Sequence, residues 1–256
     1  MTDFTTITAC GECCTGCSKK LSGECPGCIE ADGRVPEWAQ SGMCKVHACC
    51  KEHNAGFCGI CSEFPCVKLP QMISWNPNIV YHLSMLRDEY IISHLSSKFN
   101  IRRLSVDDIP QAVALCEKNT LYYEYCPPFV SEQSIRDDMN ALPPGKTVAD
   151  KYYVGFYDGK RLVAVLDLIM SFPDKTTAFI GFFMTHADLQ NKGMGSGIIE
   201  ELCGALSQIG MKEVRLCWVK GNPQAEHFWH KNGFKETGAT NVTEAYTAIV
   251  ARKELI

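Results

Sequence analysis

The sequence predicts an α+β fold, a mixed and mostly antiparallel sheet flanked by helices, preceded by a small cysteine-rich domain. Twelve of the 16 cysteines lie at or before Cys66, so two segments of different chemistry are joined. After residue 99, short apolar runs alternate with segments of helical periodicity. Two of those runs flank Asp158-Gly159, a hairpin signal that makes part of the sheet antiparallel.

Charge and hydropathy exclude two classes of partner. Lys and Arg number 8 against 10 Asp and Glu through Lys98, and 17 against 19 from Phe99 onward. Nucleic-acid-binding proteins carry an excess of cations that neutralises phosphates, so no nucleic acid is expected. The first residues lack the charged start and apolar core of a secretory signal, and no apolar run reaches the length of a membrane span. The expectation is a cytoplasmic protein without a membrane partner.

The cysteine-rich domain, residues 1–75, repeats the CxxC pair. Two cysteines at this spacing can present both thiolates to one tetrahedral ion, and two pairs close a structural zinc site. Metal is favoured over disulfides in a reducing cytosol. The ferredoxin spacing fails, since steps from Cys10 and Cys13 reach Gly16. A segment with so few large apolar residues needs metal to fold, and one or two zinc ions per chain are expected.

Two alternatives stay open for this domain. The metal site is either purely structural or serves redox or metal sensing. His47 and His53 can each replace a thiolate, although with so many cysteines both are expected to face solvent or to lie behind the ligands.

The pattern "CGECCTGC…CPGC…CKVHACCKEHNAGFCGICSEFPC" resembles a small cysteine-rich domain of unknown function found in many prokaryotic proteins. The resemblance implies a metal-binding module without implying an activity, and leaves Cys13 and Cys50 unmatched. The matched cysteines, which are the candidate metal ligands, are Cys10, Cys14, Cys17, Cys25, Cys28, Cys44, Cys49, Cys58, Cys61 and Cys66.

A connecting helix is predicted over residues 76–98. Asn76 is a plausible N-cap and Pro77 suits the first helical position. Apolar residues from Ile79 to Ile91 recur at helical spacing, so the connector is expected to be stiff and to pack on one or both domains.

The second domain, residues 99–256, alternates strands and helices. The run 177–185 is apolar on both faces, so it is expected at the centre of its sheet. Residues 121–142 are expected to be irregular or helical. The expected strands cover residues 100–105, 151–157, 160–170, 177–185, 213–219 and 245–254, and the expected helices cover residues 107–119, 198–209 and 223–232.

Three glycines lie at alternate positions in "QNKGMGSG", residues 190–197, between the central strand and a helix. This is not the dinucleotide fingerprint, which needs glycine where Ile198 stands, and it is not a P-loop. Glycines permit close approach, and the free N–H groups and dipole of a helix N-terminus favour an anion such as a pyrophosphate. A tight turn without a ligand is the alternative.

The motif "QNKGMG" resembles the [RQ]xxGxG motif of the GCN5-related N-acetyltransferases (GNAT family), and "NPQAEHFWHKNGF" resembles their second signature. "IRRLSVDDIPQAVAL" is similar to their first strand and helix, and the match runs in the family's order from about Ile101 onward. The resemblance implies an acetyl-CoA-dependent N-acetyltransferase acting on a primary amine of an unidentified small molecule or protein. A non-catalytic acyl-CoA-binding or metal-responsive interaction protein is the alternative, and turnover separates the two.

The resemblance also implies where acetyl-CoA binds. Main-chain groups of the glycine loop would hold the pyrophosphate, the end of the central strand would pair with the pantetheine amides, and Asn222 would bond the pantetheine arm. Phe228 would pack near the thiol end or simply join the core. The implied cofactor residues are Phe183, Met184, Thr185, Gln190, Asn191, Lys192, Gly193, Met194, Gly195, Ser196, Asn222 and Phe228.

The catalytic groups are less well defined. Many family members have a tyrosine that protonates the leaving thiolate, and Trp229 stands at that position here. An indole N–H does not give up its proton near neutrality. Candidate bases are His186, just past the central strand, and Tyr246, at the start of the last strand. The tyrosines between residues 122 and 125 either wall an acceptor pocket or pack in the core.

Overall fold

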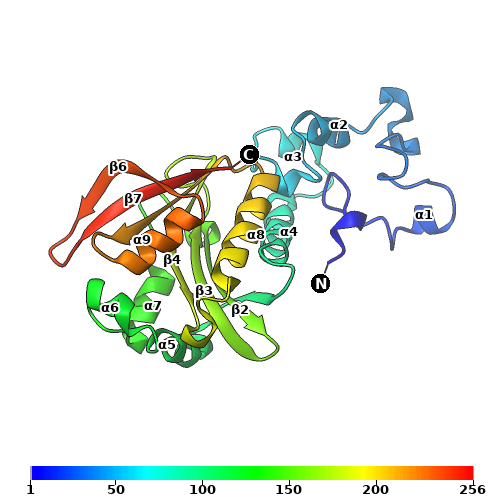
Figure 1. Cartoon of the computed structure of the whole chain (residues 1–256). Coiled ribbons are helices and arrows are strands. Elements are labelled where there is room, and N and C mark those ends of the chain that lie inside the picture. Colours follow the sequence, from blue (N-terminus) through cyan, green and yellow to red (C-terminus); the bar gives the residue numbers. More distant parts are fainter. Residues whose placement is uncertain (1, 256) are drawn as a thin grey trace. The chain divides into compact units, whose positions relative to one another are not determined.

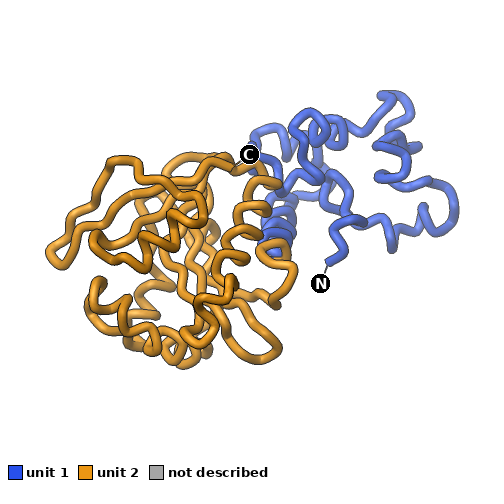
Figure 2. Tube along the Cα trace, viewed as in Figure 1, with its two compact units in different colours: residues 1–92 blue, residues 93–256 orange. Residues whose placement is uncertain are grey.

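The computed structural model describes residues 2–255 (Figure 1). The chain divides into two compact units, Met1–Ile92 and Ser93–Ile256 (Figure 2). The first unit contains the cysteine-rich segment and most of the connecting helix. The second contains the predicted α+β domain. None of the helices among the described residues is long and apolar enough to cross a membrane.

The first unit consists of short helices. An isolated bridge pairs Ile7 with Cys13, and no named strand occurs among the described residues of this unit. Its apolar cluster combines Val46 and Phe57, which precede Cys66, with Leu69 and Leu83, which follow it. Residues after Cys66 therefore supply core that the first 66 residues lack. The helices are η1 (Phe4–Thr6), α1 (Ser18–Leu21), η2 (Pro36–Ser41), α2 (Lys45–Glu52), η3 (Cys58–Ile60), α3 (Leu69–Met72) and α4 (Ile79–His94).

The connecting helix α4 is confirmed, but it begins at Ile79 rather than at Pro77. Asn76 forms a turn before the helix instead of capping it from the adjacent position. Its Oδ1 accepts from the N–H of Asn78 at 3.0 Å, and its carbonyl accepts from the N–H of Ile79 at 3.1 Å. Leu86 and Tyr90 pack against the apolar cluster of the first unit.

The second unit is built on one seven-stranded sheet of order β1-β2-β3-β4-β5-β7-β6. Among residues 2–255 only the β4–β5 pair is parallel, which confirms a mixed and mostly antiparallel sheet. The central position of the run 177–185, here β4, is also confirmed. The strands are β1 (Asn100–Arg103), β2 (Lys151–Asp158), β3 (Arg161–Ile169), β4 (Thr177–Thr185), β5 (Glu213–Val219), β6 (Lys235–Val242) and β7 (Thr247–Glu254).

Both faces of the sheet centre are covered, because the interior residues of β2 and β3 are buried without alternation. One face packs against α5 and α7, through Ile109 and Ile135 against Val165 and Met184. The predicted hairpin joins β2 to β3, but its turn is Gly159-Lys160 rather than Asp158-Gly159, because Asp158 is still paired in β2; Gly159 has φ +59°. The helices of this unit are η4 (Val106–Asp108), α5 (Ile109–Cys116), α6 (Thr120–Tyr125), α7 (Glu132–Asn140), η5 (Val148–Asp150), η6 (Ala187–Leu189), α8 (Met194–Gln208) and α9 (Pro223–Lys231).

Strands β4 and β5 separate partway along their length. They pair in parallel only as far as Ile180 and Leu216. β4 then continues beside β3 to Thr185, whereas β5 continues beside β7 to Val219. Main-chain groups on one edge of β4 are therefore free of a strand partner just before the glycine loop. This opening positions the site described next.

Candidate active site

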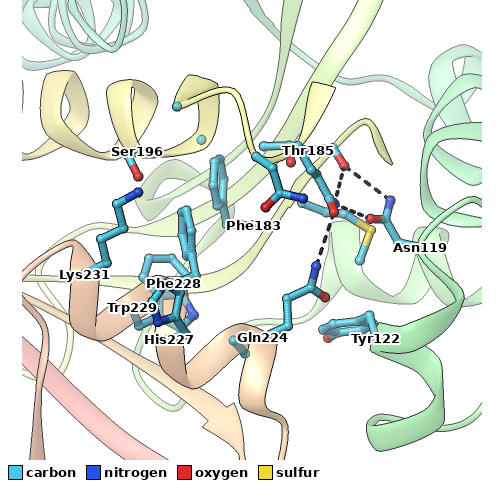
Figure 3. A pocket seen from close by; sticks show the side chains of 16 residues that line it. Asn119, Tyr122, Phe183, Thr185, Ser196, Gln224, His227, Phe228, Trp229 and Lys231 are labelled. Carbon is cyan, nitrogen blue, oxygen red and sulfur yellow. Dashed lines mark hydrogen bonds between the residues drawn. The ribbon is translucent and has the colours of Figure 1, made fainter. Parts of the chain in front are cut away.

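A cavity of about 340 Å³ opens beside the end of β4 (Figure 3). Its walls come from β4, the glycine loop, the start of α6 and helix α9. The structure thus brings together most of the residues that the sequence implied for acetyl-CoA. Those that line the cavity are Phe183, Met184, Thr185, Gln190, Asn191, Gly193, Gly195, Ser196 and Phe228.

Three of the implied residues lie outside this cavity. Lys192 and Met194 line a neighbouring hollow together with Phe99 and Glu201. Asn222 is 3 % exposed and caps α9, where its Oδ1 accepts from the N–H of Ala225 at 3.1 Å. Its side-chain oxygen therefore already has a structural role.

The glycine loop presents unpaired main-chain donors to the cavity. Gly193, the N-cap of α8, has φ +81°, a conformation that side chains rarely adopt. No side chain of the described residues caps this helix. Because the first N–H groups of a helix lack an intrahelical acceptor, those of Met194, Gly195 and Ser196 are available to a ligand. The helix dipole adds positive potential there, which suits an anion.

Aromatic rings form the opposite wall. Phe183 and Phe228 stack with ring centroids 6.0 Å apart, and Phe228 meets Trp229 edge-on at 4.9 Å. Trp229 is 7 % exposed and packs on Phe234 at 5.1 Å. Phe228 therefore lines the cavity while resting on core residues.

A chain of side-chain amides crosses the cavity (Figure 3). Gln224 donates to Gln190 Oε1 at 3.2 Å, and Gln190 donates to Asn119 Oδ1 at 2.6 Å. Asn119 and Gln190 also donate to the Thr185 carbonyl, at 3.3 and 3.4 Å. A ligand that pairs with this carbonyl must displace one of the two amides. Asn119 and Gln224 were missed from the sequence, because neither residue falls on a glycine or signature position.

A lysine faces the glycine loop across the cavity. Lys231, the last residue of α9, lines the cavity and its ammonium group points toward Ser196 (Figure 3). No ion pair of Lys231 occurs among residues 2–255. An uncompensated cation next to a helix N-terminus favours a diphosphate. The lysine in the second signature was the available signal, although the sequence analysis did not use it.

Neither candidate base lines the cavity. His186 is 9 % exposed, with Arg161 Nη2 3.2 Å from its Nε2, and its Nδ1 accepts from the N–H of Asp188 at 3.3 Å. Burial, followed by the positive charge of Arg161, lowers the pKa of His186, so the imidazole is neutral near pH 7.

Tyr246 lies in the turn before β7 rather than in the strand, because β7 begins at Thr247. The Cys126 thiolate, followed by burial, raises the pKa of Tyr246. The phenol is therefore protonated at neutral pH.

The thiols of the first unit gather in two groups. Burial, followed by the thiolates of Cys58, Cys61 and Cys66, raises the pKa of Cys49. Burial, followed by Cys14, Cys10 and Cys25, raises the pKa of Cys28 to about 12. Yet within residues 2–255 no three or more His, Cys, Asp or Glu side chains are arranged to hold a metal ion, so the donor positions do not by themselves fit zinc.

The fold resembles solved acetyltransferases at low sequence identity. The crystal structure of an acetyltransferase from Thermus thermophilus is 16 % identical with a TM-score of 0.51, covering 63 % of this chain and 99 % of that chain. The ribosomal-protein-S18-alanine N-acetyltransferase from Escherichia coli is 16 % identical with a TM-score of 0.44, covering 60 % of this chain and 92 % of that chain. PaiA N-acetyltransferase from Thermoplasma acidophilum, solved in complex with coenzyme A, is 18 % identical with a TM-score of 0.44, covering 60 % and 97 %.

The sequence itself matches a family over the part of the chain that builds the cavity. Residues 115–234 match the Acetyltransferase (GNAT) family, whereas a comparison with curated proteins found no match. The matched range contains β4, the glycine loop, α8 and α9. Residues 115–234 are therefore similar to the GNAT acetyltransferases, and this match supports acetyl-CoA-dependent N-acetylation as the activity.

Proposed function

We propose that the cavity beside β4 is where this chain binds acetyl-CoA and transfers the acetyl group to an amine acceptor. The observation that supports this proposal most strongly is that two features lie side by side. These are the unpaired N–H groups at the start of α8 and the edge of β4 that has no neighbouring strand. The first suits a diphosphate. The second suits the amides of an extended arm, in the way that an added strand pairs with a sheet edge. Lys231 adds a cation at the diphosphate end.

Acyl transfer also needs a donor for the developing oxyanion. Main-chain N–H groups on the open edge of β4, near Met184 and Thr185, are suitably fixed for this task. Positioning of the amine next to the thioester provides much of the remaining acceleration.

The leaving thiolate needs a proton, and Trp229 does not supply one. Tyr122 is the tyrosine that lines the cavity among the described residues. Burial raises the pKa of Tyr122 well above its ordinary value, so the phenol is protonated at neutral pH. We assign to Tyr122 the proton donation that a signature tyrosine performs in many relatives. Tyr246 is likewise a donor rather than a base at neutral pH, which leaves His186 as the candidate base.

Turnover tests this function. The purified chain should release the coenzyme A thiol from acetyl-CoA when a panel of aliphatic amines and lysine peptides is added, and mass spectrometry should find the acetylated amine. Binding of acetyl-CoA without thiol release on any acceptor would identify a non-catalytic acyl-CoA-binding protein instead.

We also propose that the first unit binds zinc through matched cysteines. The support is the repeated CxxC spacing, in which each pair can present two thiolates to one tetrahedral ion. The chain would then draw part of the stability of its first unit from metal–thiolate bonds.

A further inference from the structure

The open edge of β4 begins at an exposed glycine in the middle of the sheet. The part of β4 that pairs with β5 ends at Ile180, so the open edge starts at Gly181. Gly181 is exposed although β4 is the central strand. The register of β4 against β3 shifts here by one residue, which makes Gly181 the extra residue of a β-bulge. The bulge therefore marks the place where β4 and β5 begin to separate.

A carboxylate occupies the space in front of this glycine. A Cβ added to Gly181 would lie 2.7 Å from Asp167 Oδ2, which is too close for a side-chain carbon. Asp167 lies on β3, and its register partners are Tyr153 on β2 and Phe182 on β4. Both partners belong to the apolar face that α5 and α7 cover, and residues directly opposite one another share a face of the sheet. The carboxylate therefore lies on that face, at the start of the open edge.

One cation holds this carboxylate, and one of its oxygens can still accept a hydrogen bond. Lys151 Nζ donates to Asp167 Oδ2 at 2.7 Å, and the two side chains are 4 % and 11 % exposed. Asp167 Oδ1 makes no hydrogen bond within residues 2–255. Burial raises the pKa of Asp167, and Lys151 opposes the rise. The other titratable groups near it are Tyr153 on β2 and Asp138 on α7. A carboxylate in this environment is suited to accept a proton.

The two ends of the open edge serve different parts of a bound thioester. Thr185 precedes the glycine loop, where the diphosphate is proposed to bind. Gly181 lies at the other end, about 13 Å away along an extended strand. An arm that starts at the loop and pairs with this edge carries its thioester toward Gly181. His186 directly follows Thr185 and so lies at the diphosphate end, whereas Asp167 lies at the thioester end.

The proton donor assigned above lies near the same part of β4. Tyr122 lines the cavity, and its ring meets Phe182 edge-on at 5.9 Å. Phe182 is the register partner of Asp167. Gly181 and Asp167 lie outside the cavity lining, where the open edge continues beyond it. The phenol and the carboxylate therefore flank the same residue of β4, so one can serve the thiolate and the other the amine.

We propose that Asp167 is the catalytic base that takes the proton of the attacking amine. The proposal rests on the proposed function, since it places the thioester along the open edge of β4. The amine nitrogen bonds to the thioester carbon, and a proton passes from this nitrogen to the Asp167 carboxylate while Lys151 stays protonated. The carbon–sulfur bond then breaks, and the thiolate takes the proton of Tyr122. Transfer of a proton from Asp167 to Tyr122 through solvent restores both groups.

Two acceptors that differ mainly in basicity test this role with the full chain. Ethylamine holds its proton strongly during attack, whereas 2,2,2-trifluoroethylamine is far less basic and loses its proton readily to water. Removal of the base should lower kcat/KM for ethylamine by about 100-fold, the lower end of the range for a general base. The loss for trifluoroethylamine should be about tenfold or less. A purely structural role of Asp167 would lower both values equally.

Two variants remove the base in independent ways. Asp167→Asn alone would leave a buried ammonium without a counterion, so it is combined with Lys151→Met. Gly181→Ala keeps both charges and places a Cβ against the carboxylate. Asp158→Asn, at the exposed end of β2, is the control for a lost acidic charge and should act as the wild type does. All of these variants should keep the Kd for acetyl-CoA. Unchanged kcat/KM in the double variant, or equal losses on both amines, overturns the proposal.

The single variant Lys151→Met provides a second readout. Because Lys151 opposes the rise in the pKa of Asp167, its removal should raise that pKa further. The acid limb of kcat, measured with saturating trifluoroethylamine, should therefore move to higher pH. An acid limb that stays in place would show that a different group accepts the proton.

A measurement without an amine separates this proposal from the proposed function. With acetyl-CoA alone, water can replace the amine, and thiol release by the chain then needs the same base. If the wild type releases thiol with water or an amine and the double variant does so equally fast, the role of Asp167 is refuted and the proposed function stands. If the wild type releases no thiol with either, the proposed function fails and the proposal fails with it.

Discussion

Gly195 and Phe228 approach so closely that a Cβ at Gly195 would lie 3.2 Å from Phe228 Cε2. The same Cβ would lie 3.4 Å from Thr185 Cγ2. Gly195 thus lets the start of α8 approach both the end of β4 and the aromatic wall. Glycine is required at these two positions for different reasons. Gly193 adopts a left-handed conformation, and Gly195 leaves no space for a side chain.

Gly195→Ala is expected to weaken acetyl-CoA binding while the chain stays folded. Overpacking of about 1–3 kcal/mol would move Phe228 or the loop and lower the affinity roughly 5- to 140-fold. Gly204→Ala is the matched control, because it lies within α8 with nothing within 4 Å of its added Cβ. It should bind as the wild type does and gain up to about 1 kcal/mol in stability. Equal affinity in both variants, measured by calorimetry, would contradict the role of Gly195.

Lys231→Gln is expected to raise the Kd for acetyl-CoA roughly tenfold, by removing a charge-assisted contact to the diphosphate. The loss should shrink as salt is added, because salt screens the wild-type attraction. Lys160→Gln, in the exposed hairpin turn, serves as the control for a simple change of net charge. If both variants lose affinity equally, Lys231 has no specific contact with the ligand.

Tyr122→Phe should lower kcat by about 100-fold, the lower end of the range for a general acid. The KM for acetyl-CoA should change little, since the ring stays in place. Tyr125→Phe, on the same helix but outside the cavity lining, should behave as the wild type does. A Tyr122→Phe enzyme with full kcat would show that water or another group protonates the thiolate.

Asp138→Asn should stabilise the chain in a pH-dependent way. The pKa of Asp138 is about 6 in the folded chain, above its ordinary 3.8. Its ionisation therefore reduces stability as pH rises from about 4 to 6, and the reduction persists at higher pH. The Tm of the variant relative to the wild type should increase between about pH 4 and pH 7.5. A Tm difference that is constant with pH would mean that the carboxylate is fully hydrated.

Purification without added metal tests the zinc proposal. Elemental analysis should find about one or two zinc ions per chain, and Cys61→Ser should lower that number. Cys13→Ser, which alters an exposed and unmatched cysteine, should retain it. A wild-type chain without zinc, or one with disulfides between the matched cysteines, would contradict the proposal.

The sheet and its central motifs were predictable because their signals are local. β4 is confirmed at the predicted bounds. A short apolar run that is followed by a glycine-rich loop can hardly be anything but a buried strand that ends before the loop. Strand β6 was missed, because all eight of its residues are exposed and no alternation distinguishes a solvated edge strand from a loop. The start of α4 was placed two residues early, because Asn76 and Pro77 suit both an N-cap and a turn.

Some of the residues that line the cavity could likewise be predicted from the sequence, and others could not. Most of the implied cofactor residues lie in one continuous motif, so the sequence alone brings them together. Asn119 reaches the cavity from the start of α6, distant along the chain, and no motif marks it. Gln224 and Lys231 lie on α9 with Phe228, and of these two only Lys231 stands at a defined position of the second signature.

A structure of the chain with coenzyme A tests the central claim most directly. The account predicts diphosphate density within hydrogen-bonding distance of the main-chain N–H groups of Met194, Gly195 and Ser196, with the pantetheine arm along the unpaired edge of β4. Density for the diphosphate elsewhere, with these N–H groups left to solvent, would contradict it.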